Sequence, residues 1–277
     1  MGYRAPPAVR HFQRGALIGR GSSGTVYEAL DLDRGCLIAV KEIEFPEDLA
    51  EDEGWVQRLR EVMSEVRLMA DLPRHEHIVQ FYGVTREDFK VHVLMEHVSG
   101  GSLRSLLLKY GPLPERVAIA YTHQVLEALT FLHSQGIVHR DIKGANVLVT
   151  TAGVIKLSDF GAAKIVRGCD GNLPTSLHGT PYWMAPEVVR QAGHGAPSDV
   201  WSVGATVLEM LTGHAPFHDL SPAAAFLKIG HCQTEVPLPG TVPGRARGFL
   251  RRCFVRDPTC RATPSELLRH PWLVLSE

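Results

Sequence analysis

With 277 residues, the chain has room for one large domain or for two lobes of unequal size. Hydrophobic residues make up 44% of it, charged residues make up 21%, and the formal net charge is −1. This is the composition of a soluble globular protein, and it lacks the basic surplus of a nucleic-acid-binding protein.

Residues 1–14 lack the apolar core of a signal peptide, and no run of about 18 apolar residues is present to cross a membrane. The five cysteines are odd in number and show no C-x-x-C spacing, so they predict reduced thiols rather than disulfides or a zinc site. We therefore expect a soluble cytoplasmic protein that binds neither nucleic acid nor membrane.

The first hundred residues predict an antiparallel sheet with one main helix. Short β-rich runs at 16–18, 25–27 and 37–40 are separated by glycine-containing turns. Residues 51–72 carry apolar side chains at helical spacing instead, behind an acidic run that suits a helix N-terminus. Two further strand-like runs follow at 79–83 and 91–95, and the Ser-Gly-Gly sequence at 99–101 then interrupts the pattern. We expect a lobe boundary at this interruption.

The rest of the chain predicts mostly helix. Long apolar-rich helices are expected at 117–133 and 199–211, with short strands at 137–138, 147–149 and 154–157. No internal repeat and no low-complexity linker is found. The predicted fold class is α+β, in which a small antiparallel-sheet lobe with one main helix (12–98) precedes a larger, mainly helical lobe (99–273).

Residues 19–26 spell G-x-G-x-x-G-x-V between two predicted strands. A glycine-rich turn exposes backbone N–H groups and lets them approach phosphate closely. The motif alone is a weak signal, because a hairpin without a ligand and a dinucleotide fingerprint also fit it. The fingerprint requires a helix directly after the glycines and a parallel βαβ series. Because a strand is predicted there instead, we favour a loop that covers phosphates.

Lys41 lies on a predicted strand two elements after this loop, from which an ammonium group could reach the phosphates. A lysine on a strand is more often a solvated edge residue. Glu65 on the predicted helix is the candidate partner that would give Lys41 a role in the site. Glu61, one helical turn earlier, is the alternative partner.

The most specific signal is H-R-D-I-K-G-A-N at residues 139–146, which D-F-G follows at 159–161. In this order and spacing the two motifs resemble the catalytic loop and the metal-binding motif of protein kinases. The G-T-P-Y-W-M-A-P-E sequence at 179–187 and D-V-W-S-V-G at 199–204 extend the resemblance, so that it runs from residue 12 to residue 273. It also implies that Arg261 pairs with Glu187, far from the phosphates.

The resemblance implies phosphoryl transfer from ATP with the help of Mg²⁺, a reaction that depends on positioning and charge neutralisation. Asp141 would orient the substrate hydroxyl and accept its proton, and Lys143 would neutralise the migrating phosphate. Asn146 and Asp159 would bind the metal. Lys41, tethered by Glu65, would hold the α- and β-phosphates. The expected nucleotide-binding residues are Ile18, Gly19, Gly21, Ser22, Gly24, Val26, Ala39, Lys41, Met95, Glu96, Val98, Ser102 and Leu148. Ser102 stands where many kinases place an acidic ribose contact, which leaves that contact open.

The K-G-A-N spelling and the 179–187 sequence are similar to the STE group of kinases, which includes the enzymes of the MAP kinase cascade. We therefore expect serine/threonine specificity, and within the group we favour a MAP kinase kinase kinase that acts on a MAP kinase kinase. An STE20-type kinase, a lipid or small-molecule kinase and a pseudokinase scaffold are the weaker alternatives.

The segment between Asp159 and Glu187 is poor in apolar residues and is predicted to be mobile before modification. The resemblance places an activating phosphate on Ser176, or on its neighbour Thr175, added by an upstream kinase or by autophosphorylation. Arg140 and Lys164 are the cations expected to receive it. A flexible polar loop without any switch is the alternative.

Overall fold

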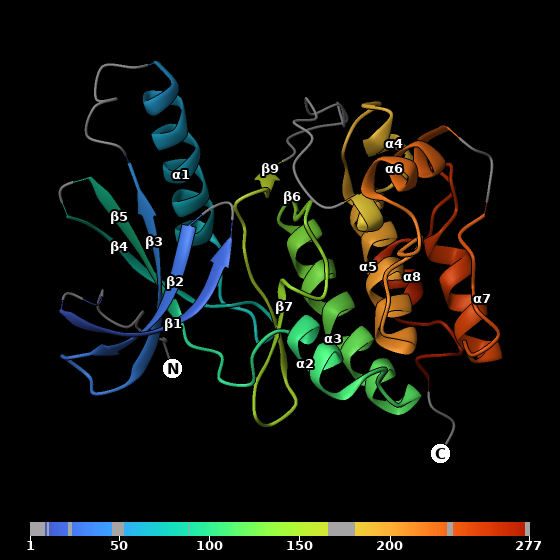
Figure 1. The fold of residues 1–277 in the computed structure, drawn as a ribbon, viewed down its shortest axis with the longest axis horizontal. Coiled ribbons are helices and arrows are strands. Elements are labelled where there is room, and N and C mark those ends of the chain that lie inside the picture. The colour runs from blue at the N-terminus through green and yellow to red at the C-terminus, as the bar shows by residue number, and fades with distance from the viewer. Residues whose placement is uncertain are drawn as a thin grey trace. The chain divides into compact units, whose positions relative to one another are not determined.

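The computed structural model describes residues 9, 11–21, 24–45, 53–87, 89–165, 181–231 and 235–274 (Figure 1). The chain forms two compact units that meet in the sequence between Ser99 and Gly100. Residues Glu76–Ile78 are an exception, because they pack with the second unit. There the main-chain N–H of Leu157 donates to the carbonyl of His77 at 2.9 Å. None of the helices formed by the described residues is long and apolar enough to cross a membrane.

The first unit is built on a five-stranded antiparallel sheet with the strand order β1-β2-β3-β5-β4. The pairing of Gly21 with Gly24 closes the hairpin that contains the glycine motif, and Val26 lies opposite Lys41 on the next strand. The predicted antiparallel arrangement is therefore confirmed. Its strands are β1 (Phe12–Gly21), β2 (Gly24–Asp31), β3 (Leu37–Glu44), β4 (Phe81–Glu87) and β5 (Lys90–Glu96).

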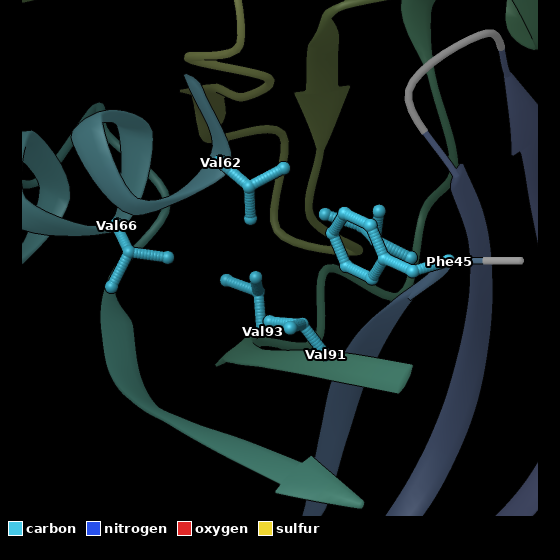
Figure 2. Close-up of a cluster of buried hydrophobic side chains, with 6 residues drawn as sticks. Phe45, Val62, Val66, Val91 and Val93 are labelled. Carbon is cyan, nitrogen blue, oxygen red and sulfur yellow. The ribbon is translucent and has the colours of Figure 1, made fainter. Parts of the chain in front are cut away.

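Helix α1 (Glu53–Asp71) covers one face of this sheet. Figure 2 shows Val62 and Val66 projecting from the helix toward Val91 and Val93 of β5, with Phe45 beside them. The apolar residues of β3 alternate between the two faces, as successive side chains of a strand must. Ile43 joins the cluster under α1, whereas Val40 and its neighbours form a second buried cluster on the opposite face. Lys41, two residues before Ile43, therefore points to the side that α1 covers.

The second unit is mainly helical. Its two longest helices, α3 (Glu115–Ser134) and α5 (Ala196–Thr212), pack against each other. A short hairpin pairs β7 (Val147–Val149) with β8 (Ile155–Leu157), and a separate two-stranded antiparallel sheet pairs β6 (Ile137–Val138) with β9 (Lys164–Ile165). The remaining elements are α2 (Leu103–Tyr110), the 3₁₀ turn η2 (Pro181–Trp183), α4 (Pro186–Val189), α6 (Pro222–His231), α7 (Gly244–Cys253) and α8 (Pro264–Leu267).

Helix α5 forms the core of this unit, because every residue from Ser198 to Met210 is buried. A helix that is buried all round normally carries apolar side chains on every face. Two carboxylates, Asp199 and Glu209, break this rule with no exposed surface at all. Buried carboxylates need hydrogen-bond donors, and both find them in the loop that contains the H-R-D motif.

Candidate active site

The glycine motif forms the tip of the β1–β2 hairpin, so a strand and not a helix follows it. Gly24 adopts a φ of +145°, and a Cβ at this position would lie 2.6 Å from the carbonyl oxygen of Glu42. Only glycine fits there without strain. Among the described residues, no atom lies within 4 Å of where a Cβ would stand at Gly21, which leaves open space beside the backbone of this glycine. Ser22 lies outside the described residues.

Lys41 forms an ion pair with Glu65 of α1, in which the Nζ–Oε1 distance is 3.0 Å. The side chains are only 6% and 9% exposed, so solvent screens the pair weakly. The predicted pairing is confirmed. The side chain of Glu61, the alternative partner, is not among those the structure describes.

The expected nucleotide-binding residues of the first unit gather on β1, β2, β3 and the end of β5. Ala39 of β3 is buried and lies opposite Met95 of β5, while Ile18 of β1 is 48% exposed. Glu96 follows Met95, and its side chain accepts a hydrogen bond from the main-chain N–H of Gln80 at 3.1 Å. Val98 beyond it is buried.

In the second unit, Leu148 lies on β7 and is bridged to Ser102. Ser102 is the N-cap of α2, where its hydroxyl oxygen accepts a hydrogen bond from the main-chain N–H of Ser105 at 3.1 Å. This cap gives Ser102 a local structural role that the sequence analysis did not foresee.

Asp199 of α5 fixes the start of the catalytic loop. Its two carboxylate oxygens accept hydrogen bonds from the main-chain N–H groups of His139 at 2.9 Å and Arg140 at 2.8 Å, and His133 contributes a further contact at 2.9 Å. Burial by itself would raise the pKa of Asp199, but the hydrogen bond and the positive charge of His133 leave that pKa below its usual value. The loop bends sharply at Arg140, whose φ is +71°.

The next residues of the loop converge on Asp141. The Nζ of Lys143 lies 3.0 and 2.8 Å from its two carboxylate oxygens. The side-chain amide of Asn146 donates to Asp141 twice at 2.8 Å, once to the carboxylate and once to the main-chain carbonyl. The structure thus brings together three residues that the sequence predicted.

Asp159 is connected to this cluster through Ser158, whose main-chain N–H and hydroxyl both donate to the carbonyl of Asn146, at 2.9 and 3.0 Å. Asp159 has a φ of +60°, and Phe160 after it is buried against His139 with ring centroids 5.1 Å apart. A carboxylate and an amide oxygen are ligands that suit a hard cation such as Mg²⁺. No group of three or more His, Cys, Asp or Glu side chains in the described part of the chain could hold a metal ion. A cation at Asn146 and Asp159 would therefore need phosphate oxygens or water as its other ligands.

A small pocket lies beside the catalytic loop within the second unit, lined by Arg140, Asp141, Trp183, His194 and neighbouring residues. Within the part of the chain that the structure describes, the buried Nε of Arg140 has no hydrogen-bond partner. Burial and, to a smaller extent, the charge of Arg140 lower the pKa of His194 to about 4. His194 is therefore neutral at physiological pH.

Glu209 is the residue of this region that sequence reasoning missed. Its carboxylate accepts hydrogen bonds from the main-chain N–H of Gly144 at 3.3 Å, from Arg104 at 3.3 Å and from the indole of Trp183 at 3.2 Å. Burial raises the pKa of Glu209, although these contacts oppose the shift. The only feature of the sequence that could have pointed to Glu209 is its position as an acidic residue within the apolar helical run at 199–211.

The remaining predictions concern ion pairing and regulation. Arg261 pairs with Glu187 through two hydrogen bonds of 2.6 and 2.9 Å, as expected. Lys164 is exposed on β9, opposite Val138. Ser176 and Thr175 lie outside the described residues.

Comparison with known proteins gives matches over almost the whole chain. The family described as "Protein kinase domain" matches residues 12–273. Mitogen-activated protein kinase kinase kinase ANP1 of Arabidopsis thaliana is 46% identical over 276 residues, which cover 98% of this chain and 40% of that protein. Mitogen-activated protein kinase kinase kinase 2 of the same plant is 45% identical, covering 96% of this chain and 41% of its own length. Mitogen-activated protein kinase kinase kinase A of Dictyostelium discoideum is 40% identical, and the match covers 95% of this chain and 28% of that protein. The chain thus spans about two fifths of the length of the two plant relatives.

Proposed function

The chain belongs to the protein kinase family, and we propose that it transfers the γ-phosphate of ATP to serine or threonine hydroxyls of a protein substrate. The observation that carries this proposal is the convergence of Lys143 and Asn146 on the carboxylate of Asp141. The buried Lys41–Glu65 ion pair of the first unit adds to it. A scaffold without activity would have no need of this complete set.

In the proposed reaction, Asp141 orients the substrate hydroxyl and accepts its proton, and Lys143 neutralises charge on the phosphate in transit. Lys41, held by Glu65, binds the α- and β-phosphates. Mg²⁺, held by Asn146 and Asp159, supplies further charge neutralisation when it is bound. The backbone of the glycine motif covers the phosphates.

We propose further that the substrate is a MAP kinase kinase and that the enzyme works in the cytoplasm. The support for the substrate is the similarity to several MAP kinase kinase kinases at 40–46% identity. An upstream kinase or autophosphorylation would activate the enzyme at Ser176 or Thr175, with Arg140 and Lys164 as partners of the phosphate. Full activity of phosphate-free enzyme, and of a variant that carries Ser176→Ala and Thr175→Ala together, would refute this mode of activation.

The catalytic proposal is tested with Asp141→Asn. We expect turnover to fall by about 10²–10⁴-fold, because a positioned base contributes this much to the rate. ATP affinity and folding should stay near those of the wild type. Asp219→Asn, a change of an exposed aspartate between α5 and α6, is the matched control and should keep full activity. Turnover of Asp141→Asn close to that of the wild type would remove Asp141 from the mechanism.

A further inference from the structure

Glu209 connects three separate parts of the second unit. It lies near the C-terminal end of α5, coloured yellow-orange in Figure 1, and no part of its side chain reaches solvent. Its three hydrogen-bond donors come from α2, from the catalytic loop and from η2. Such an arrangement is unusual inside a helix whose other buried residues are mostly apolar.

The peptide groups of Gly144 are held on both sides. Its N–H donates to Oε2 of Glu209 at 3.3 Å, and its carbonyl accepts a hydrogen bond from the main-chain N–H of Arg104 at 2.8 Å. The guanidinium group of Arg104 closes the ring by donating to Oε1 of Glu209 at 3.3 Å. Gly144 directly follows Lys143, which binds both carboxylate oxygens of Asp141.

The close approach of Glu209 also explains why residue 144 is a glycine. A Cβ at this position would lie 2.8 Å from Oε2 of Glu209 and 3.2 Å from its Cδ. Real Cβ atoms do not approach another atom so closely, and Glu209 is buried with little room to move. Alanine at residue 144 would therefore displace either the carboxylate or the catalytic loop.

The contacts of Glu209 are poorly suited to stabilising the fold. Distances of 3.2–3.3 Å are at the long end of the range for hydrogen bonds. Arg104 is 43% exposed, so water weakens its attraction to the carboxylate. Burial also removes the hydration of the carboxylate, and this desolvation costs free energy. Apolar side chains of similar size would avoid that cost. Stability alone does not account for a carboxylate in this position.

We infer that Glu209 is a positioning residue for phosphoryl transfer, which holds the Gly144 peptide so that Lys143 and Asp141 keep their geometry. The inference rests on the proposed kinase function and extends it to a residue that does not touch the substrate. Displacing the loop by even about 1 Å can reduce the rate of an enzyme by about 10²-fold. The effect is expected on kcat, since the nucleotide-binding residues stay unchanged.

The test compares Glu209→Gln and Gly144→Ala with the wild type in a steady-state phosphotransfer assay, with rates given per folded molecule. We expect each change to lower kcat by about 10-fold to 100-fold, while the KM for ATP stays within about twofold. Glu115→Gln is the matched control: Glu115 also accepts an indole hydrogen bond, from Trp272 at 2.8 Å, but it lies outside this network. A purely structural role of Glu209 would lower the melting temperature and leave kcat unchanged.

Combining Gly144→Ala with Glu209→Asp gives a second, independent test. The shorter aspartate side chain makes room for the new methyl group, so the double variant should lose less activity than the product of the two single losses. This comparison decides the matter even if Glu209→Gln does not fold. A strictly multiplicative loss would overturn this inference, as would kcat values of Glu209→Gln and Gly144→Ala equal to that of the wild type. Either result would leave the proposed kinase function intact. A wild-type chain that transfers no phosphate would refute the proposed function, and this inference with it.

Discussion

Arg261→Ala tests how the second unit is held together. Arg261 and Glu187 form a two-pronged ion pair, with Nη1–Oε1 at 2.6 Å and Nη2–Oε2 at 2.9 Å, and their side chains are 0% and 8% exposed. The arginine also donates to the carbonyls of Pro197 at 2.7 Å and Val255 at 2.8 Å. The pair thus joins α4 to the segment before α8.

Removing the arginine would leave the Glu187 carboxylate buried without its cation. Ser198 would remain as a hydrogen-bond donor at 3.0 Å, but its hydroxyl carries no charge. Loss of one partner from a buried ion pair costs about 3–5 kcal/mol in the free energy of unfolding. The hydrogen bonds that Arg261 donates to the two carbonyls are lost as well, which pushes the cost toward the upper end of this range. At about 2–4 °C per kcal/mol for a chain of this size, the melting temperature should fall by about 6–20 °C.

The measurement is thermal and urea unfolding of Arg261→Ala beside the wild type. Glu187→Gln should be destabilised as well, because it leaves the arginine charge unpaired. Arg245→Ala, which removes an exposed arginine from α7, is the control and should unfold like the wild type. An Arg261→Ala variant with the melting temperature of the wild type would refute the argument from burial.

Three further predictions follow from the site and its surroundings. Asp159→Asn should weaken Mg²⁺-dependent nucleotide binding, measured by titration calorimetry, and equal affinity in both proteins would refute the metal assignment. Burial lowers the pKa of His194 to about 4, so the unfolded chain binds a proton that the folded chain excludes between this value and about 6.5. Stability should therefore fall by up to about 3 kcal/mol as pH drops through that window. His194→Gln should remove this component, and an unchanged pH profile of unfolding would contradict it. In native protein, iodoacetamide should spare Cys253, because complete burial raises the pKa of its thiol. Peptide mass spectrometry that finds Cys253 labelled as fast as the exposed Cys36 and Cys260 would contradict the packing around it.

The sequence predicts the architecture well where the pattern is long or the motif is dense. The helical spacing at 51–72 and the strand runs around Lys41 correspond to α1 and β3. Helical spacing could not choose between Glu61 and Glu65 as the partner of Lys41, because both lie on one side of a helix, one turn apart. That choice depends on how the helix packs on the sheet.

Other features could not be predicted because they depend on tertiary contacts. Short helices such as α2 span only two turns, too few for a hydrophobic period to stand out. The N-cap role of Ser102 becomes visible only once that helix is known. Glu209 appears in the sequence as one acid in an apolar helix, and its link to Gly144 joins residues that are 65 positions apart. No local pattern can indicate such a pairing.

The most direct test of the central claim is a phosphotransfer assay with purified protein, ATP, Mg²⁺ and a panel of catalytically inactive MAP kinase kinases. The phosphorylated residues are mapped by mass spectrometry, and the Asp141→Asn variant is run in parallel. We expect phosphate on serine or threonine of at least one MAP kinase kinase with the wild type, and almost none with the variant. Labelling confined to tyrosine would contradict the serine/threonine specificity, and a wild-type chain that labels no protein would contradict the account as a whole.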